Sequence, residues 1–287
     1  MKRKKNQYSF AFLIPVITIY GGLFILPTII SFFFSMTVWD FTSFRWVGIQ
    51  NFINFFSEYS LRIGISNTFI YAILTCGFKV VIGLLFAVIL TSKIRTKTFV
   101  RSVVFFPNLI STVAVGIIFS SLMHPSKGLF NKILESFGLG GIDWLGNRSI
   151  ALYSVVAVDV WKGVGVATVI YIAGIMAISK DYYEAASLDG ATRWQQFKCI
   201  TVPLCRPSMN SVIILSFIGG MRSFDLIWTM TGGGPGFATD TMASVIYKQY
   251  AAGFYGLSTA GNVIMFVIIA IIAFPLFNWL ASKEVEA

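Results

Sequence analysis

Four charged side chains occur in pairs inside apolar stretches of this sequence. Asp159 and Lys162 are three residues apart in one stretch, and Arg222 and Asp225 are three apart in the next. Residues at this spacing share a helix face, so each pair could form an ion pair. A charge at mid-bilayer costs on the order of 2.5–3.5 kcal/mol on insertion scales, so it needs a partner or a function. The pairs could line a polar path for a solute, or they could only hold two helices together, and the sequence leaves both open.

Other single residues near these charges are less informative. Trp161 lies next to the first pair, and Gly220 with the glycine before it precedes the second pair, where glycines permit a close helix approach or a local break. Lys79 and Asn108 are isolated in apolar stretches, and we expect them to pack within the protein. We expect the single histidine, His124, to be an ordinary loop residue.

The longest polar segment of the chain, residues 181–203, holds the second group of candidate residues. Asp181 and Glu184 have the spacing of a capping box, in which an N-cap acceptor is followed three residues later by an acid. Gly190 suits a helix stop, because the left-handed conformation needed there carries no penalty for glycine. The segment therefore begins with one short helix.

The same segment predicts a second short helix. Thr192 and Gln195 repeat the capping-box spacing. Trp194 and Phe197 are three apart and start an apolar face, and Pro203 is expected to end the helix. We call residues 181–203 the elbow, because two short helices at an angle outside the membrane would have that form.

The elbow residues admit a simple and a functional interpretation. Glu184 could merely cap its own helix, and Ala185 and Ala186 could merely reflect helix propensity. Small alanines also let another protein surface approach closely. An exposed face with Trp194 and Phe197 would be costly in water unless another surface covers it.

Composition predicts the elements that must position these residues. The chain has 287 residues, of which 56% are hydrophobic and 12% charged, whereas soluble domains average about 25% charged residues. A helix needs about 20 apolar residues to cross a bilayer, so we expect an all-α integral membrane protein with a single transmembrane domain over residues 1–287. Its six predicted spans are roughly residues 10–37, 68–92, 102–123, 151–178, 207–229 and 259–281.

Basic residues predict the orientation of these spans. Six spans place both termini on one side, and the elbow, between the fourth and fifth spans, lies on that side too. That side carries 13 basic residues and the other side 6. The positive-inside rule then places both termini and the elbow in the cytoplasm. The net charge of +10 therefore reflects membrane topology, and we expect no nucleic-acid partner.

The three outer loops are then residues 38–67, 124–150 and 230–258. The first contains Val47–Phe56, which we expect to form a short helix at the membrane interface. The second is rich in turn residues. The third opens with Thr231–Gly236, a glycine-rich tight turn.

Several kinds of chemistry are missing from the sequence. It contains no Gly-Lys dipeptide and hence no GxxxxGK[ST] phosphate-binding loop. With one histidine and three unpaired cysteines, it offers no multi-histidine metal site and no CxxC pair. We expect no catalytic residues, no metal and no cofactor bound by this chain. If transport uses nucleotide energy, another chain must bind the nucleotide.

At the elbow the sequence resembles a known family. Glu184-Ala-Ala186, then Gly190, then Ile200-x-Val-Pro203 is similar to the EAA loop of inner-membrane permease subunits of binding-protein-dependent ABC importers. The family pattern ends in Ile-x-Leu-Pro, and Val202 here replaces the leucine. Other segments resemble the carbohydrate-uptake, maltose-type branch of that family: Tyr183–Ala191, Thr231–Pro235, Val160–Gly163 and Pro125-x-x-Gly128-x-x-Asn131.

The resemblance implies a prokaryotic cytoplasmic-membrane complex. In such importers two permease subunits, usually different, form the pore, and two cytoplasmic ATPase subunits bind ATP and Mg. An extracytoplasmic solute-binding protein delivers the carbohydrate. The elbow would be a coupling helix that inserts into an ATPase subunit, with Glu184 contacting a basic residue there. The implied coupling residues are Glu184, Ala185, Ala186, Gly190, Trp194 and Pro203.

The resemblance also points to a substrate pathway. The family's sugar-lining positions fall near Trp161, Gly163, Gly220 and Ser223, which join the charged residues Asp159, Lys162, Arg222 and Asp225. The same fold could import another solute, such as a phosphorylated polyol. A transporter or channel driven by an ion gradient is the remaining alternative, but the sequence lacks the internal repeat expected of one.

Overall fold

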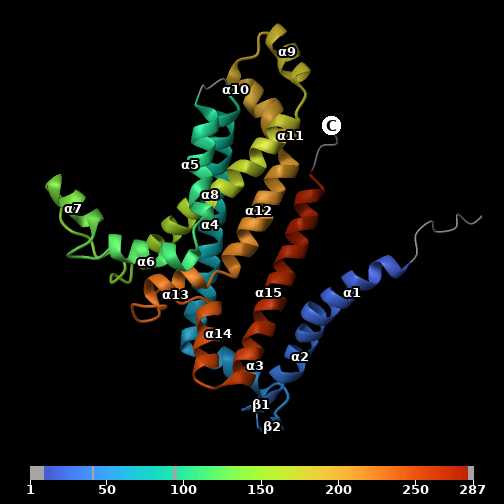
Figure 1. Ribbon diagram of the computed structural model, residues 1–287, viewed down its shortest axis with the longest axis vertical. Coiled ribbons are helices and arrows are strands. Elements are labelled where there is room, and N and C mark those ends of the chain that lie inside the picture. Colours follow the sequence, from blue (N-terminus) through green and yellow to red (C-terminus); the bar gives the residue numbers. More distant parts are fainter. Residues whose placement is uncertain (1–9, 41, 93–95, 284–287) are drawn as a thin grey trace, which may run out of the picture. The chain divides into compact units, whose positions relative to one another are not determined.

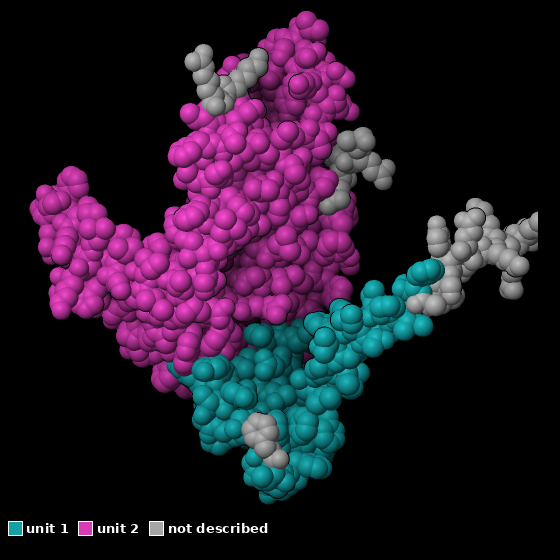
Figure 2. Space-filling model, in the orientation of Figure 1, with its two compact units in different colours: residues 1–58, 246–266 teal, residues 59–245, 267–287 magenta. Residues whose placement is uncertain are grey.

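The structure, a computed structural model, describes residues 10–40, 42–92 and 96–283. The basic residues at positions 2–5, together with Lys93 and Arg95, contributed to the predicted orientation but lie outside the described residues. The chain divides into two compact units, coloured separately in Figure 2. Unit 1 comprises residues 1–58 and 246–266, and unit 2 comprises residues 59–245 and 267–287.

Unit 1 begins with an apolar helical run and continues into a small hairpin. The run consists of η1 (Phe10–Leu13), α1 (Ile14–Tyr20), the π-helical turn η2 (Gly21–Ile25) and α2 (Leu26–Ser35). Strands β1 (Thr37–Trp39) and β2 (Phe44–Trp46) pair antiparallel, and the helix α3 (Gln50–Ser57) follows. The Asn51 amide of α3 donates hydrogen bonds to the carbonyls of Ser35 and Thr37, which holds α3 at the end of α2.

Unit 2 contains most of the helices, including the elbow (Figure 1). In chain order they are α4 (Tyr59–Thr91), α5 (Lys97–Leu109), α6 (Thr112–Leu122), α7 (Leu129–Ser136), α8 (Ala151–Ala177), α9 (Lys180–Leu188), α10 (Arg193–Gln196), the π-turn η3 (Phe197–Thr201), α11 (Val202–Leu204), α12 (Arg206–Met221) and α13 (Asp225–Thr231). The last two helices, α14 (Met242–Ala251) and α15 (Tyr255–Ala281), each contribute residues to both units.

Helix α8 is the central helix of unit 2. It packs against α4, α5 and α12, and more than half of its most apolar window is buried. Two apolar clusters surround it. One is centred on Tyr71, Val155 and Ile227, and the other on Tyr171 and Val212.

The predicted membrane helices are largely present. Four helical segments of the described chain are long and apolar enough to cross a membrane: Ile14–Ser35, α4, α8 and α15. Two bent helix pairs bring the number to as many as six. The chain is thus a mainly helical membrane protein, although the β1–β2 hairpin and the short helices α7 and α14 were not predicted.

The third predicted span, residues 102–123, is not one straight helix. Helices α5 and α6 meet at an angle of 96°, and Figure 1 shows α6 running across the direction of α5. Ile110 and Ser111 have extended backbone angles that end α5. Pro107, in the last turn of α5, already removes one helical donor there. Hydropathy continues through the bend, so the sequence pattern did not reveal it.

The fifth predicted span, residues 207–229, is also broken. Helix α12 ends at Met221, residues 222–224 are not helical, and α13 begins at Asp225. At its other end, α12 meets the helix that spans Arg193–Leu204 at an angle of 66°. The break separates Arg222 from Asp225, so the expectation that these two share one helix face is wrong.

Candidate functional site

The first helix of the elbow, α9, begins differently from the prediction. Its N-cap is Ser179, whose hydroxyl accepts a hydrogen bond from the Asp181 backbone N–H at 3.3 Å. Asp181 is therefore a first-turn residue, where its charge favours the helix dipole, and the predicted Asp181–Glu184 capping box is wrong. As a result Glu184 is not needed as a cap. It is exposed, and no hydrogen bond or ion pair in the described chain involves its carboxylate.

The end of α9 matches the prediction for Gly190. This glycine has a φ of +80°, the left-handed conformation expected of a helix stop. The Gly190 N–H donates to the Ser187 carbonyl, and the Ala191 N–H donates to the Ala186 carbonyl at 2.8 Å. These two bonds form a Schellman motif, which satisfies the last carbonyls of α9 and turns the chain.

The second helix of the elbow starts as predicted and ends later. Thr192 and Gln195 form a complete capping box at the start of α10. The helix then runs through Pro203 to Leu204, so the expectation that Pro203 ends it is wrong by one residue. The π-turn η3 lies directly before the proline and accommodates its missing N–H, and the 66° bend follows at Cys205.

Two side-chain hydrogen bonds fix the angle between the two elbow helices. The Tyr183 hydroxyl on α9 lies 3.0 Å from the Thr201 hydroxyl in η3. The Gln196 amide on α10 donates to the Ser187 hydroxyl on α9 at 2.8 Å. Because the elbow is braced from within, it can move as one piece.

Large apolar side chains on the elbow are uncovered. Leu188 is 90% exposed and Trp194 69% exposed, and the Trp194 ring lies 5.4 Å from the ring of Phe197. Ala185 is exposed and Ala186 half-buried. No residue of α9 is buried, and Figure 1 shows α9 standing beyond the ends of α8 and α12. An aromatic and aliphatic patch of this kind marks a site for another protein surface.

Among the charged residues of the predicted spans, Asp159 has an unexpected partner. The Lys79 Nζ on α4 lies 2.6 Å from the Asp159 Oδ2 on α8, and this is the ion pair of the described chain. The possible pairing of Asp159 with Lys162 on its own helix is therefore not formed. Lys79 packs within the protein as expected, but it also forms an ion pair that was not predicted. The two side chains are 12% and 21% exposed, so the pair is largely shielded from solvent.

Two predicted pathway glycines serve close packing. A Cβ at Gly163 would lie 2.7 Å from the Lys79 Cε, so this glycine on α8 makes room for the lysine side chain. A Cβ at Gly220 would lie 2.7 Å from the Ala72 backbone and 2.9 Å from the Thr75 hydroxyl. Gly220 thus lets α12 approach α4 closely.

The remaining predicted pathway residues do not form a single group. The half-exposed Trp161 packs its ring 5.1 Å from that of Phe119 on α6. Arg222 and Asp225 are exposed on either side of the α12–α13 break, and Ser223 between them is half-buried. The path assigned to these residues stays a prediction.

A pocket of about 180 Å³ lies between α4, α8 and α12. Lys79, Gly163 and Ser216 contribute to its lining, and the rest of the lining is aliphatic. Gly163 is the one predicted pathway residue in this lining. Lys79 and Ser216 were missed, although Lys79 carried a signal as a charge in a predicted span.

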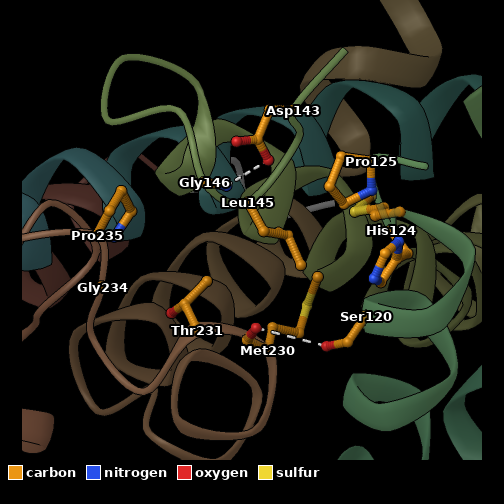
Figure 3. A pocket seen from close by; sticks show the side chains of 11 residues that line it. Ser120, His124, Pro125, Asp143, Leu145, Gly146, Met230, Thr231, Gly234 and Pro235 are labelled. Carbon is orange, nitrogen blue, oxygen red and sulfur yellow. Dashed lines mark hydrogen bonds between the residues drawn. The ribbon is translucent and has the colours of Figure 1, made fainter. Parts of the chain in front are cut away.

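A second pocket, of about 400 Å³, joins two loops that the sequence had singled out separately. Figure 3 shows His124 and Pro125 across the pocket from Thr231 and Pro235, with Leu145 and Met230 between them. The His124 Nδ1 accepts hydrogen bonds from the backbone N–H groups of Ser126 and Lys127, so His124 holds its own turn as an ordinary loop residue would.

The motif around Pro125 is a structural clamp. The Asn131 side chain is buried, and its amide donates to the carbonyls of Pro125 and Ile142. Its Oδ1 accepts from the Ile142 N–H and the Trp144 indole N–H. All four bonds fix the 124–146 loop. Among the described residues, no cluster of His, Cys, Asp or Glu could hold a metal ion.

Comparisons with known proteins agree with this geometry. The chain is 31% identical over 271 residues to the trehalose/maltose transport permease MalF of Thermococcus litoralis, covering 94% of this chain and 92% of that protein. It is 30% identical to the probable ABC transporter permease YurN of Bacillus subtilis, covering 99% of this chain and 100% of that protein.

The fold has a solved counterpart as well. A subunit of a bacterial ABC transporter that imports the acidic polysaccharide alginate matches with a TM-score of 0.85 at 24% identity, covering 95% of this chain and 94% of that chain. Residues 79–284, which include the ion pair and the whole elbow, match the family of binding-protein-dependent transport system inner membrane components. The chain therefore belongs to the permease subunits of binding-protein-dependent ABC transporters.

Proposed function

We propose that this chain is a pore-forming permease subunit of an ATP-driven importer that moves a sugar or oligosaccharide across the cytoplasmic membrane. ATP and Mg bind to separate ATPase subunits, and this chain catalyses no reaction. The observation that carries the proposal is the elbow, with its braced helices, its unpaired Glu184 and its uncovered Leu188 and Trp194. The trehalose/maltose relative supports a carbohydrate as the substrate.

The elbow acts as the coupling helix. Glu184 pairs with a basic residue of an ATPase subunit, and Ala185 and Ala186 allow the close approach of that subunit. Trp194 gains a partner surface, so that its exposed ring leaves water on assembly. Gly190 and Pro203 shape the elbow so that closure of the ATPase dimer moves it as one body. The motion passes through the bend at Cys205 into α12.

The complex contains a second permease subunit, different from this chain, and two ATPase subunits. A solute-binding protein outside the membrane delivers the substrate. Both termini and the elbow lie in the cytoplasm, and the excess of basic residues on that side supports this orientation. The 400 Å³ pocket between His124 and Pro235 then faces the side from which the substrate arrives.

The substrate passes the layer formed by α4, α8 and α12. Asp159 and Gly163 contribute from α8, and Ser223, Arg222 and Asp225 flank the α12–α13 break. Trp161, Lys162 and Gly220 complete the set. Trp161 offers an aromatic face, half exposed, that suits the C–H face of a sugar ring.

Reconstitution tests the proposal. The chain, its second permease subunit and the ATPase subunits are placed in proteoliposomes with the solute-binding protein loaded with labelled maltodextrins and other saccharides. We expect uptake that requires ATP and the binding protein, with ATP hydrolysis stimulated by the loaded binding protein. Uptake driven by a sodium or proton gradient without ATP would overturn it in favour of an ion-coupled transporter.

A further inference from the structure

The ion pair between Lys79 and Asp159 is mostly buried, but both side chains keep some solvent exposure. The lysine reaches the pocket between α4, α8 and α12, where Gly163 leaves space for its side chain, and the aspartate pairs with it from α8. The residues are 80 positions apart in the chain, so the pair exists only in the folded protein. Because the two charges are in contact, this layer carries no net charge from them.

The pair keeps unused hydrogen-bonding capacity. A lysine ammonium has three N–H donors, and only one is directed at the Asp159 Oδ2. No hydrogen bond in the described part of the chain engages the other carboxylate oxygen, Oδ1. Lys79 therefore keeps free donors toward the pocket, while Asp159, which pairs with it from outside the pocket lining, keeps the total charge of the pair at zero.

The rest of the pocket lining fits the same kind of ligand. Val166, Val212 and Leu215 give it apolar walls, and Ser216 adds a hydroxyl. A saccharide ring has apolar C–H faces and hydroxyl groups at its edge, and each hydroxyl both donates and accepts. Such a ligand can contact Lys79, the Ser216 hydroxyl and the apolar walls together without bringing in a charge.

An anionic ligand would fit this layer poorly. It would have to compete with Asp159 for Lys79, and success would leave the Asp159 carboxylate shielded from water without a counter-charge. Removing one partner of a buried ion pair is strongly unfavourable because it leaves an uncompensated charge away from water. The same argument, with the roles reversed, applies to a cationic ligand.

We propose that the Lys79–Asp159 ion pair is a charge filter in the solute path, and that the substrate of this subunit is an uncharged polyhydroxylated compound. Phosphorylated polyols and acidic sugars are excluded at this layer. Lys79 and Asp159 are specificity-determining residues that favour substrates without a net charge. The inference rests on the proposed function and names the substrate class for it.

Charged thiol reagents test the filter without any knowledge of the substrate. Ser216→Cys is made in the full complex after Cys76, Cys199 and Cys205 have been changed to serine. The thiol is then reacted with sulfonatoethyl methanethiosulfonate, an anion, and with trimethylammonioethyl methanethiosulfonate, a cation. The ratio of the two rates reports the charge felt at residue 216. Changes in the reactivity of the thiol itself affect both reagents and cancel in the ratio.

With the ion pair intact, we expect the ratio to equal that of a reference thiol outside the elbow, Leu139→Cys, at a residue that is 57% exposed. Asp159→Asn leaves Lys79 uncompensated and should raise the anion-to-cation ratio at residue 216 by about tenfold, as expected for a unit charge several ångströms away in a partly shielded medium. Lys79→Gln should lower the ratio by a similar factor, and the double variant should restore it. The ratio at the Leu139→Cys reference should not change.

The proposal is overturned if both single variants leave the ratio at residue 216 unchanged, or if the intact pair already favours one reagent tenfold. All measurements use complexes that elute as a single species. Should one single variant fail that criterion, the exchanged variant, Lys79→Asp with Asp159→Lys, keeps both charges and must keep the neutral ratio. Labelling needs neither ATP nor sugar, so a failure of ATP-driven uptake would leave this result intact.

Discussion

The elbow and the layer around the Lys79–Asp159 ion pair differ in how their polar and apolar groups are satisfied within unit 2. The elbow satisfies its backbone and brace hydrogen bonds from residues close in the chain, and it leaves Glu184, Leu188 and Trp194 uncovered. The layer is closed by residues from separate helices, and its Lys79 and Asp159 charges are paired with each other. A surface that is rigid and incomplete suits a protein partner, whereas an enclosed, ion-paired site suits a small molecule in transit.

The largest effect is expected when one partner of the Lys79–Asp159 ion pair is removed. Lys79→Met leaves the Asp159 carboxylate shielded and unpaired, and we expect a loss of about 3 kcal/mol in the free energy of unfolding. Thermal unfolding of the purified complex, followed by loss of the monodisperse peak, measures it. Lys132→Met, at an exposed lysine on α7 outside the layer, is the control. An unaltered unfolding temperature in Lys79→Met would mean that the pair does not hold the layer together.

The elbow should respond to a charge change in binding and not in folding. Glu184→Lys reverses the charge that we propose pairs with the ATPase subunit, and we expect about 2 kcal/mol of lost association, roughly a thirtyfold weaker complex. Glu135→Lys, at an exposed acid on α7, is the matched control. Pull-down of the ATPase subunits and stimulated ATP hydrolysis are measured together. Equal stimulation in both variants would remove Glu184 from the coupling surface.

The shape of the elbow can be tested separately from its charge. Gly190→Ala places a Cβ at a φ of +80°, and the left-handed conformation costs a non-glycine residue about 1 kcal/mol, although the space around it is open. We expect coupling to fall a few-fold while folding persists. Gly219→Ala, at a helical glycine with equally open surroundings, should leave coupling unchanged. If the two variants behave alike, the turn at Gly190 does not set the elbow.

The smallest effect is expected from pH at the turn between β1 and β2 in unit 1. Like the elbow, this turn is stabilised by hydrogen bonds between residues close in the chain. The Asp40 carboxylate accepts hydrogen bonds from Thr42 and Ser43, which lower the pKa of Asp40 from 3.8 to about 2. A lowered pKa means that the charged form stabilises the turn above pH 3.8 and that this stability is lost as the pH falls toward 2. Fluorescence of the hairpin tryptophans against pH should show this transition, and Asp40→Asn should abolish it.

The sequence predicted best what depends on neighbouring residues. The Thr192–Gln195 capping box and the left-handed Gly190 are local features, and both are present. The N-cap of α9 was assigned to Asp181 because its spacing to Glu184 fitted. Ser179, two residues earlier, takes that position, and the spacing rule alone cannot choose between two acceptors so close together.

Features that depend on distant residues were beyond such rules. Nothing in the sequence around Lys79 points to Asp159, because the contact forms only when α4 packs on α8. The bend at residues 110–111 was missed because the overall hydropathy of residues 102–123 describes one span where the backbone makes two helices. At residues 222–224 the charges of Arg222 and Asp225 interrupt the apolar run, but the average hydropathy of the surrounding residues still predicted one span. The coupling and pathway roles of the individual residues stay predictions.

The space left by Gly163 has a consequence for the evolution of related chains. Because Gly163 has no side chain, the Lys79 side chain of α4 fits against α8 at this point. The residue types at positions 79 and 163 therefore depend on each other. A relative with alanine or a larger residue at the equivalent of position 163 should have replaced the lysine at 79, and with it the aspartate at 159. Aligned homologues should therefore show these three positions changing together, and a lineage that lost the trio would be free to take charged solutes.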